Sequence, residues 1–482
     1  MSLPRESEME RPVMTREQLL SLGQRLLAMS SADIDIVNIT VSHTANIITR
    51  LAHNRVLTSD DGERLTIQIE TMVGGPPVYT VITNQWDDRV LAAGLRQCEA
   101  LLRASPSYKP DSGMKHEEYV QDAVAPVQLW HDTTIGAMQT TRETVIPAIL
   151  DIVRQQKLHA AGFVGLMARS EAVIRKDGSI LLYHDETDSE LTVTAVSQDG
   201  KNIGWGGQAA RDWSQIKPAE VTQHAMTMAT LGGTPVAVEP GKRTAILTPA
   251  AVAQLLRYFA GQWHALNTNQ GQTALSKSRM GGNKLRQRIM DQRFTMSSDP
   301  TDPAGGYRPY VIWEGVASPA MTWVEHGVLT NLAFNMPWYA MERGTRYAAL
   351  PNSFRLSGGT TSIEEMIAQC PDGILVNRFS DVDLLDEHTC LLTGVTQGGC
   401  FLVRDGKVSK AIKNLRFMTS PFFFLNNVEA LGVTERAAFG YTPLTQPEYM
   451  TSDGFYEWPR QPVIVPPMMV RDFNFSAVAD AV

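Results

Sequence analysis

Residues 398–408, Gly-Gly-Cys-Phe-Leu-Val-Arg-Asp-Gly-Lys-Val, contain an Asp-Gly pair, Asp405-Gly406, flanked by alternating apolar residues. Such pairs favour the tight turns that join antiparallel strands, because their residues tolerate positive φ. Comparable pairs follow alternating stretches at Asp177-Gly178, Asp199-Gly200 and His326-Gly327. The sequence therefore predicts four β-hairpins and, in its second half, a domain built on an antiparallel sheet.

Helical patterns flank these strands. Thr15 and Gln18 have the spacing of a capping box, and Leu19, Leu22 and Leu26 follow at helical period, which predicts a helix over 15–30. Further helices are predicted at 87–105, 142–157, 218–232, 249–266, 363–369 and 422–431. Further strands are predicted within 34–51, 65–71, 172–175, 180–184 and 191–195. The segment 105–139 is rich in Pro, Asp, Ser and Gly without a sustained period, which predicts a connector.

The pattern indicates an α+β protein of two domains. A chain of 482 residues is about three times the usual domain length, so two or three cores are expected. We expect a flexible tail at 1–13, an N-terminal α+β domain at 14–235 with room for a sub-boundary near 105–140, and a C-terminal antiparallel β-rich domain at 236–482.

Composition limits the classes of partner. The 43 basic and 51 acidic residues give a net charge of −8, so nucleic acid is an unfavoured partner. No apolar stretch approaches the roughly 20 residues that span a bilayer, and the polar N-terminus has no signal-peptide core. We expect a soluble cytoplasmic protein with no membrane association. Its four dispersed cysteines are expected to be reduced and mostly buried.

Spacing alone reveals no catalytic motif. His116-Glu117 lacks the second histidine of a zinc-peptidase helix, since that position is Val120, and is interpreted as a solvated charge cluster. Neither a GxSxG serine motif nor a phosphate-binding glycine loop is present. Two histidines stand beside carboxylates and are retained as alternative cation sites: His184 with Asp185 and Glu186, and His388 with Asp386 and Glu387. Solvated turns are the commoner explanation for both.

Several short motifs nevertheless resemble one known family. They are Val324–Leu329, Gly358–Thr360, Gly398–Val408, Ile412–Phe417, Asn427–Gly432 and Val470–Phe475, with weaker matches at Ile47–Arg55, Thr83–Asn84 and Gly204–Gly207. Their order over roughly residues 35–475 resembles the TldD/PmbA family, the TldD/TldE peptidases or "modulators of DNA gyrase". This resemblance implies an N-terminal α/β region followed by a domain on a large antiparallel β-sheet.

The family has two arms, and the resemblance places this chain in one of them. Proteins of the TldD arm hold zinc with an HExxxH helix and a C-terminal cysteine, whereas TldE/PmbA partners lack these ligands. At the corresponding positions this chain has Arg257, Tyr258 and Gln262, and no cysteine follows Cys400. The resemblance therefore implies a TldE/PmbA-like chain with no catalytic residue, no metal and no cofactor of its own, and zinc in its partner subunit.

The expected function is that of a non-catalytic subunit in a heterodimeric zinc metallopeptidase that processes peptides or unfolded protein segments. Its partner would be a TldD-like catalytic subunit, with a homodimer as the alternative when that partner is absent. Substrate contacts are expected at Asn352, Arg355, Gly358 and Gly359, where a tight structural hairpin is an equal alternative. Two other functions stay open: a self-sufficient homodimeric metallopeptidase with a different metal site, and a non-enzymatic peptide-binding or regulatory protein.

Overall fold

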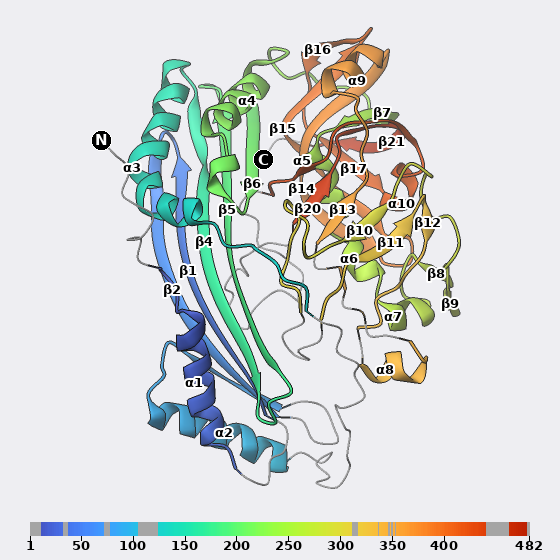
Figure 1. Cartoon of the computed structure of the whole chain (residues 1–482). Helices are drawn as coiled ribbons and strands as arrows, with labels where there is room; N and C mark the ends of the chain where they lie inside the picture. Colours follow the sequence, from blue (N-terminus) through green and yellow to red (C-terminus); the bar gives the residue numbers. More distant parts are fainter. Residues whose placement is uncertain are drawn as a thin grey trace.

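The computed structural model describes residues 11–31, 37–71, 78–104, 124–310, 317–335, 337–345, 348, 350–351, 353–439 and 462–479. Its N-terminal half is a six-stranded sheet in the order β3-β2-β1-β4-β5-β6, in which every neighbouring pair is antiparallel. The strands are β1 (Val37–Ala52), β2 (Arg55–Thr71), β3 (Val78–Thr83), β4 (His159–Arg175), β5 (Leu181–Val196) and β6 (Ile203–Ala210). Four of them are long, and they form the tall curved wall in Figure 1.

Four helices cover one face of this sheet. They are α1 (Arg16–Ala28), α2 (Asp88–Ala104), α3 (Asp132–Gln155) and α4 (Pro218–Thr230); a short 3-10 turn, η2 (Trp213–Gln215), precedes α4. Because side chains alternate along a strand, the apolar residues of one parity pack under the helices. Leu19 and Leu91 share a core with Ile67 below α1 and α2, and Val193 shares a second core with Met226 of α4. The opposite face carries polar groups together with a few apolar residues, such as Val173 and Leu182.

The C-terminal half contains a closed ring of strands. β14 (Asp372–Asp386), β7 (Gly241–Leu247), β21 (Met468–Val478), β17 (Leu415–Thr419) and β15 (Leu391–Arg404) pair in that order, and β15 pairs back with β14. β7 and β14 are parallel, whereas the other pairs of the ring are antiparallel. β16 (Lys407–Ala411) extends β15, and β18 (Val428–Leu431) pairs with β21. Within the core of the ring, Phe379 stacks on Phe473, and the Phe417 ring packs against both at a tilt.

A second six-stranded sheet packs beside the ring in the order β12-β11-β10-β13-β20-β19. These strands are β10 (Met296–Ser298), β11 (Met321–Glu325), β12 (Val328–Leu329), β13 (Phe354–Leu356), β19 (Glu435–Arg436) and β20 (Val463–Val465). A small hairpin of β8 (Ser276–Ser278) and β9 (Gly281–Asn283) stands apart. The helices are α5 (Pro249–Leu256), α6 (Phe259–Gln262), α7 (Ala265–Asn269), α8 (Pro337–Glu342), α9 (Ile363–Gln369) and α10 (Pro421–Phe424).

The predicted α+β class and the large antiparallel sheets are confirmed. All four predicted hairpin turns join paired strands: β4–β5, β5–β6, β11–β12 and β15–β16. The capping box of Thr15 and Gln18 is present at α1. Within the described residues, no helix is both long and apolar enough to cross a membrane.

Several predicted boundaries are wrong. The flexible tail predicted at 1–13 is wrong for residues 11–13, because Val13 is buried and Arg11 pairs with Asp185 at 2.6 Å. The connector predicted at 105–139 ends earlier, since α3 begins at Asp132, where Ile135 and Met138 pack into the core under the sheet. Burial stabilises the N-terminal part of α3 although its sequence has weak helical periodicity.

Two predicted helices are also shorter than expected. The helix expected over 422–431 ends at Phe424, because Val428–Leu431 pair with β21 as strand β18. Here tertiary pairing outweighs local preference. The helix expected over 249–266 is broken into α5, α6 and the start of α7.

Candidate functional site

The segment after β7 contains the positions at which the family resemblance implies a vacated zinc helix. Thr248 caps α5 by accepting a hydrogen bond from the backbone N–H of Ala251. The helix then ends at Leu256, and α6 starts three residues later at Phe259. Because of this break, positions 257, 258 and 262 do not lie on one continuous helix.

The side chains at these positions do not fit a zinc ion. The hydroxyl of Tyr258 donates to the backbone carbonyl of Val382. Gln262 is buried, and its side-chain oxygen accepts from the N–H of Ala274 at 2.8 Å. Arg257 carries a guanidinium, which has no lone pair to offer a metal. The side-chain oxygens of Tyr258 and Gln262 are thus engaged in hydrogen bonds within the core, and these three residues do not fit a zinc ion.

The predicted substrate residues divide into three cases. Asn352 lies outside the described residues. Arg355 donates to both carboxylate oxygens of Asp302 at 2.7 and 2.8 Å, and also to Thr434. Gly358 and Gly359 pack against the backbone at the end of β18, where a Cβ atom on Gly359 would lie 2.4 Å from the carbonyl oxygen of Leu431. This geometry gives Arg355 and the two glycines structural contacts and leaves their role toward a substrate as a prediction.

The alternative metal sites at His184 and His388 gain no support. Among the residues that the structure describes, no three His, Cys, Asp or Glu side chains are grouped so that they could hold an ion. His184 is buried with Nε2 at 3.5 Å from Glu186, and Glu186 is already paired with Arg211. The expectation that these residues form a solvated turn is wrong for His184 and Glu186, since both are buried in the middle of a long sheet.

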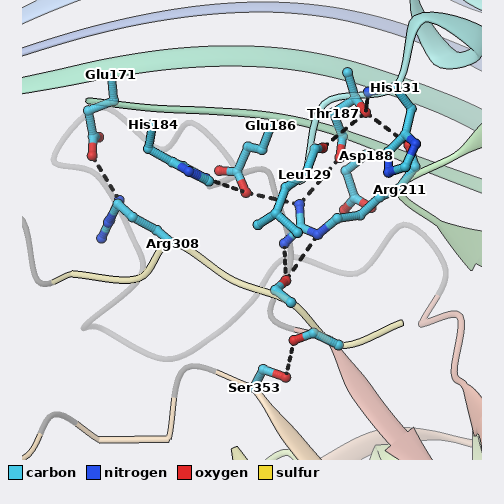
Figure 2. A network of polar contacts seen from close by, with 12 residues as sticks. Leu129, His131, Glu171, His184, Glu186, Thr187, Asp188, Arg211, Arg308 and Ser353 are labelled. Atoms are coloured by element: carbon cyan, nitrogen blue, oxygen red, sulfur yellow. Dashed lines mark hydrogen bonds and ion pairs between the residues drawn. The ribbon is translucent and has the colours of Figure 1, made fainter. Parts of the chain in front are cut away.

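The structure reveals a buried polar network that the sequence did not predict (Figure 2). Along β5, His184, Glu186, Asp188 and Glu190 alternate on one face, and all four are buried. This is the face of the N-terminal sheet opposite its helices. All seven residues from His184 to Glu190 are polar in the sequence, and such a stretch normally indicates solvent exposure rather than burial.

Arginines from other segments neutralise this row. Arg211, just after β6, donates to Glu186 at 2.9 Å and to the backbone carbonyl of Gly306 at 2.5 and 3.0 Å. Arg436 of β19 pairs with Asp188 at 2.6 Å. Burial by itself would raise the pKa of Glu186, but Arg211, His184 and Arg169 outweigh it and hold that pKa well below its ordinary value. Glu186 is therefore an ionised, buried carboxylate.

The loop after β10 connects this network to the C-terminal half. The carbonyl of Gly306 accepts hydrogen bonds from Arg211 of the N-terminal half, and Arg308 pairs with Glu171 of β4 at 3.2 Å. On the other side, Ser353 donates to the carbonyl of Gly305 at 2.7 Å. Figure 2 shows these contacts from β4 and β5 through the loop to Ser353. The loop 302–310, which we call the interdomain loop, thus links both halves of the chain.

A second junction joins two of the motifs singled out in the sequence. Trp205 of β6 packs against Gly398 of β15, where a Cβ atom would lie 2.6 Å from the Trp205 Cβ. Asn377 donates to the backbone carbonyls of Trp205 and Gly398, both at 2.7 Å. Arg378 stacks over the Trp205 ring at 4.8 Å. The glycine motifs around 204–207 and 398–399 therefore hold the two halves together.

Residues 240–477 match the family model of the PmbA/TldA metallopeptidase C-terminal domain. Through this domain, the chain belongs to the PmbA/TldD family. Among curated proteins, none matches the sequence.

Solved structures of PmbA/TldD type share the fold. TldE from Thermococcus kodakarensis aligns with a TM-score of 0.75 and 13% identity, over 94% of this chain and 99% of that chain. A proposed modulator of a DNA gyrase from Thermotoga maritima aligns with a TM-score of 0.74 and 14% identity, over 94% and 99%. A proposed modulator of DNA gyrase from Bacteroides thetaiotaomicron gives 0.71 and 14%, over 96% and 99%. At these identities the likeness shows the fold alone.

Proposed function

We propose that this PmbA/TldD family chain is the non-catalytic, TldE-like subunit of a heterodimeric zinc metallopeptidase that processes peptides or unfolded protein segments. A TldD-like partner would supply the zinc, the carboxylate base and the activated water. This chain would supply part of the wall that encloses the substrate.

One observation carries the proposal. The family resemblance implies zinc ligands and a base at three positions. There, Arg257 has no lone pair to offer a metal, Tyr258 is hydrogen-bonded to the carbonyl of Val382, and Gln262 is hydrogen-bonded to the N–H of Ala274. The helix is also interrupted between positions 256 and 259. A zinc peptidase needs several ligand atoms on a rigid scaffold, so the chemistry would have to come from another chain.

The polar face of the N-terminal sheet supports a role in enclosing substrate. It faces the C-terminal half, and two separate junctions, at the interdomain loop and at Trp205, fix the two halves against each other. A fixed arrangement of two walls suits a subunit that shapes a chamber. The proposal places the complex in the cytoplasm, in keeping with four cysteines that are free and buried.

The test uses this chain and a TldD-type protein from the same source, purified separately and together. Zinc per subunit is measured by elemental analysis, and proteolysis is measured on an unfolded peptide. We expect zinc in the partner only, a mixed dimer, and cleavage that requires both chains. Stoichiometric zinc in this chain alone, or cleavage without the partner, would refute the proposal in favour of a self-sufficient homodimer.

A variant of this chain sharpens the result. The triple substitution Arg257→His, Tyr258→Glu and Gln262→His restores the HExxxH residue types. We expect no stoichiometric zinc, because the helix is broken here and the C-terminal cysteine ligand is absent. If the triple variant binds zinc and cleaves peptide alone, the site is a recent loss and the structural reasoning about the break is wrong.

A further inference from the structure

A cavity of about 260 Å³ lies beside the Trp205 junction, between the two halves of the chain. The N-terminal half contributes the β5–β6 turn, including Ile203, and Met228 of α4. The C-terminal half contributes Phe401 and Ile412, which follow the Gly398-Gly399 bulge of β15. We call this the seam cavity.

Apolar side chains, Ile203, Met228, Phe401 and Ile412, form much of the wall of the seam cavity. Cys400 also lines it, and burial raises the pKa of its thiol to about 12, so this group is neutral. A dry cavity of about 150 Å³ with apolar walls accepts a benzene ring. The seam cavity therefore has room for one aliphatic or aromatic side chain with part of its backbone.

The rim carries two cations, Lys201 and Lys413. Its single carboxylate, Asp199, accepts hydrogen bonds from Ser197 and from the backbone N–H of Lys201. Lys201 lies 3.8 Å from that carboxylate and is largely exposed. Among the described residues, none forms an ion pair with Lys413. In a chain with a net charge of −8, this local excess of positive charge favours an anionic ligand.

We propose that the seam cavity binds the C-terminal residue of a peptide, with the apolar side chain in the cavity and the α-carboxylate between Lys201 and Lys413. That the ligand is a peptide, and not another carboxylate with an apolar group, rests on the proposed function. A fatty acid also combines a carboxylate with an apolar chain, and the test distinguishes a fatty acid from a peptide.

Binding is measured by calorimetry on the full chain without its partner, with acetyl-Gly-Gly-Leu and its C-terminal amide as probes. We expect the free acid to bind at least about tenfold more tightly than the amide, because only the acid pairs with the lysines. Lys413→Met is expected to weaken binding of the acid about five- to tenfold. The matched control is Lys407→Met, which removes the same charge from exposed β16 outside the cavity and is expected to change nothing.

A second variant tests the cavity rather than the charge. Ile203 is 39% exposed at the cavity wall, so Ile203→Trp can fill the space without an overpacked core. It is expected to abolish binding of acid and amide alike, while the thermal unfolding midpoint is unchanged. If this variant unfolds early, Met228→Phe serves the same purpose.

Three outcomes would overturn the inference: equal affinity for acid and amide, equal weakening by Lys407→Met and Lys413→Met, or octanoate binding more tightly than the peptide. The last would assign the cavity to fatty acids. Because these measurements use this chain alone, they can fail while the heterodimer still cleaves peptides. Conversely, binding here can succeed if the peptidase assay fails, so the two proposals are distinguishable.

Discussion

Removal of Arg211 is the sharpest test of the interdomain network. The guanidinium and the Glu186 carboxylate are 3% and 4% exposed and lie 2.9 Å apart. Arg211→Met keeps much of the apolar volume but leaves a buried carboxylate without its main partner. Breaking such a pair from one side typically costs about 3–5 kcal/mol. At pH 7 the loss is limited by protonation, since neutralising a carboxyl of ordinary pKa 4.5 costs about 3.4 kcal/mol at 1.36 kcal/mol per pH unit.

The assay is urea unfolding followed by tryptophan fluorescence and circular dichroism. With a slope of about 3 kcal/mol per molar urea, the expected loss of about 3–3.4 kcal/mol lowers the midpoint by about 1.0–1.1 M. The matched control is Arg404→Met, whose pair with Asp372 is about half exposed and is expected to change stability by no more than about 1 kcal/mol. The double variant Arg211→Met/Glu186→Gln should recover part of the loss, because no charge is then left buried.

The pH dependence gives an independent check of the same pair. The folded-state pKa of Glu186 is lowered, so its stabilising contribution is complete above its ordinary pKa of 4.5 and is lost as pH falls below that value. In Arg211→Met, protonation of Glu186 relieves the buried charge, so the difference from the wild type should shrink between pH 7 and pH 5. A loss below 1 kcal/mol at pH 7, or a double variant no better than the single one, would refute the reasoning.

Three further predictions follow from single contacts. Arg355→Met should speed amide exchange around Asp302 without changing peptide affinity in the heterodimer; weaker peptide binding with unchanged exchange would instead assign Arg355 to substrate. Gly204→Ala should lower the melting temperature strongly, because its Cβ would lie 2.1 Å from a backbone oxygen of α4. The control Gly261→Ala places a Cβ with nothing within 4 Å and should be neutral or stabilising by up to about 1 kcal/mol. Equal effects of the two substitutions on stability would contradict the packing at Gly204. The Cys400 thiol, with its pKa raised to about 12 by burial, should resist a thiol reagent at pH 8 until urea is added, and rapid native labelling would show that the site opens.

The sequence predicted most local elements for identifiable reasons. Asp-Gly and His-Gly pairs mark turns because few other residues accept positive φ, and the structure has positive φ at His326 and Asp405. Helix starts with a side-chain cap, as at Thr15 and Ser362, were located to within a residue. Where the signal was weaker, tertiary contacts decided: α3 extends over a stretch of weak period, and a run after Phe424 became a strand.

The candidate site was predictable only in part. Family-like motifs located the helix around Arg257 and the glycine turns. The break in that helix and the hydrogen bonds of Tyr258 and Gln262 depend on the tertiary structure and could not be predicted. Arg355 was predicted to contact substrate, whereas in the structure it donates hydrogen bonds to Asp302 and Thr434, and Asp302 lies 53 residues away along the chain. Such pairings depend on how the chain returns to itself, which spacing along the sequence does not encode.

By itself, the sequence determined the strand-and-turn pattern, the α+β class and the absence of zinc-ligand residue types at the family positions, because these depend on local backbone preference and side-chain chemistry. Only the tertiary structure decided that the polar row on β5 is buried rather than solvated. The same polar stretch of sequence fits either case. What distinguishes them is that Arg211 and Arg436 reach β5, and Arg308 reaches Glu171 on neighbouring β4, from other segments. A charge can be buried only when its partner is brought to it, and that is a property of the whole fold.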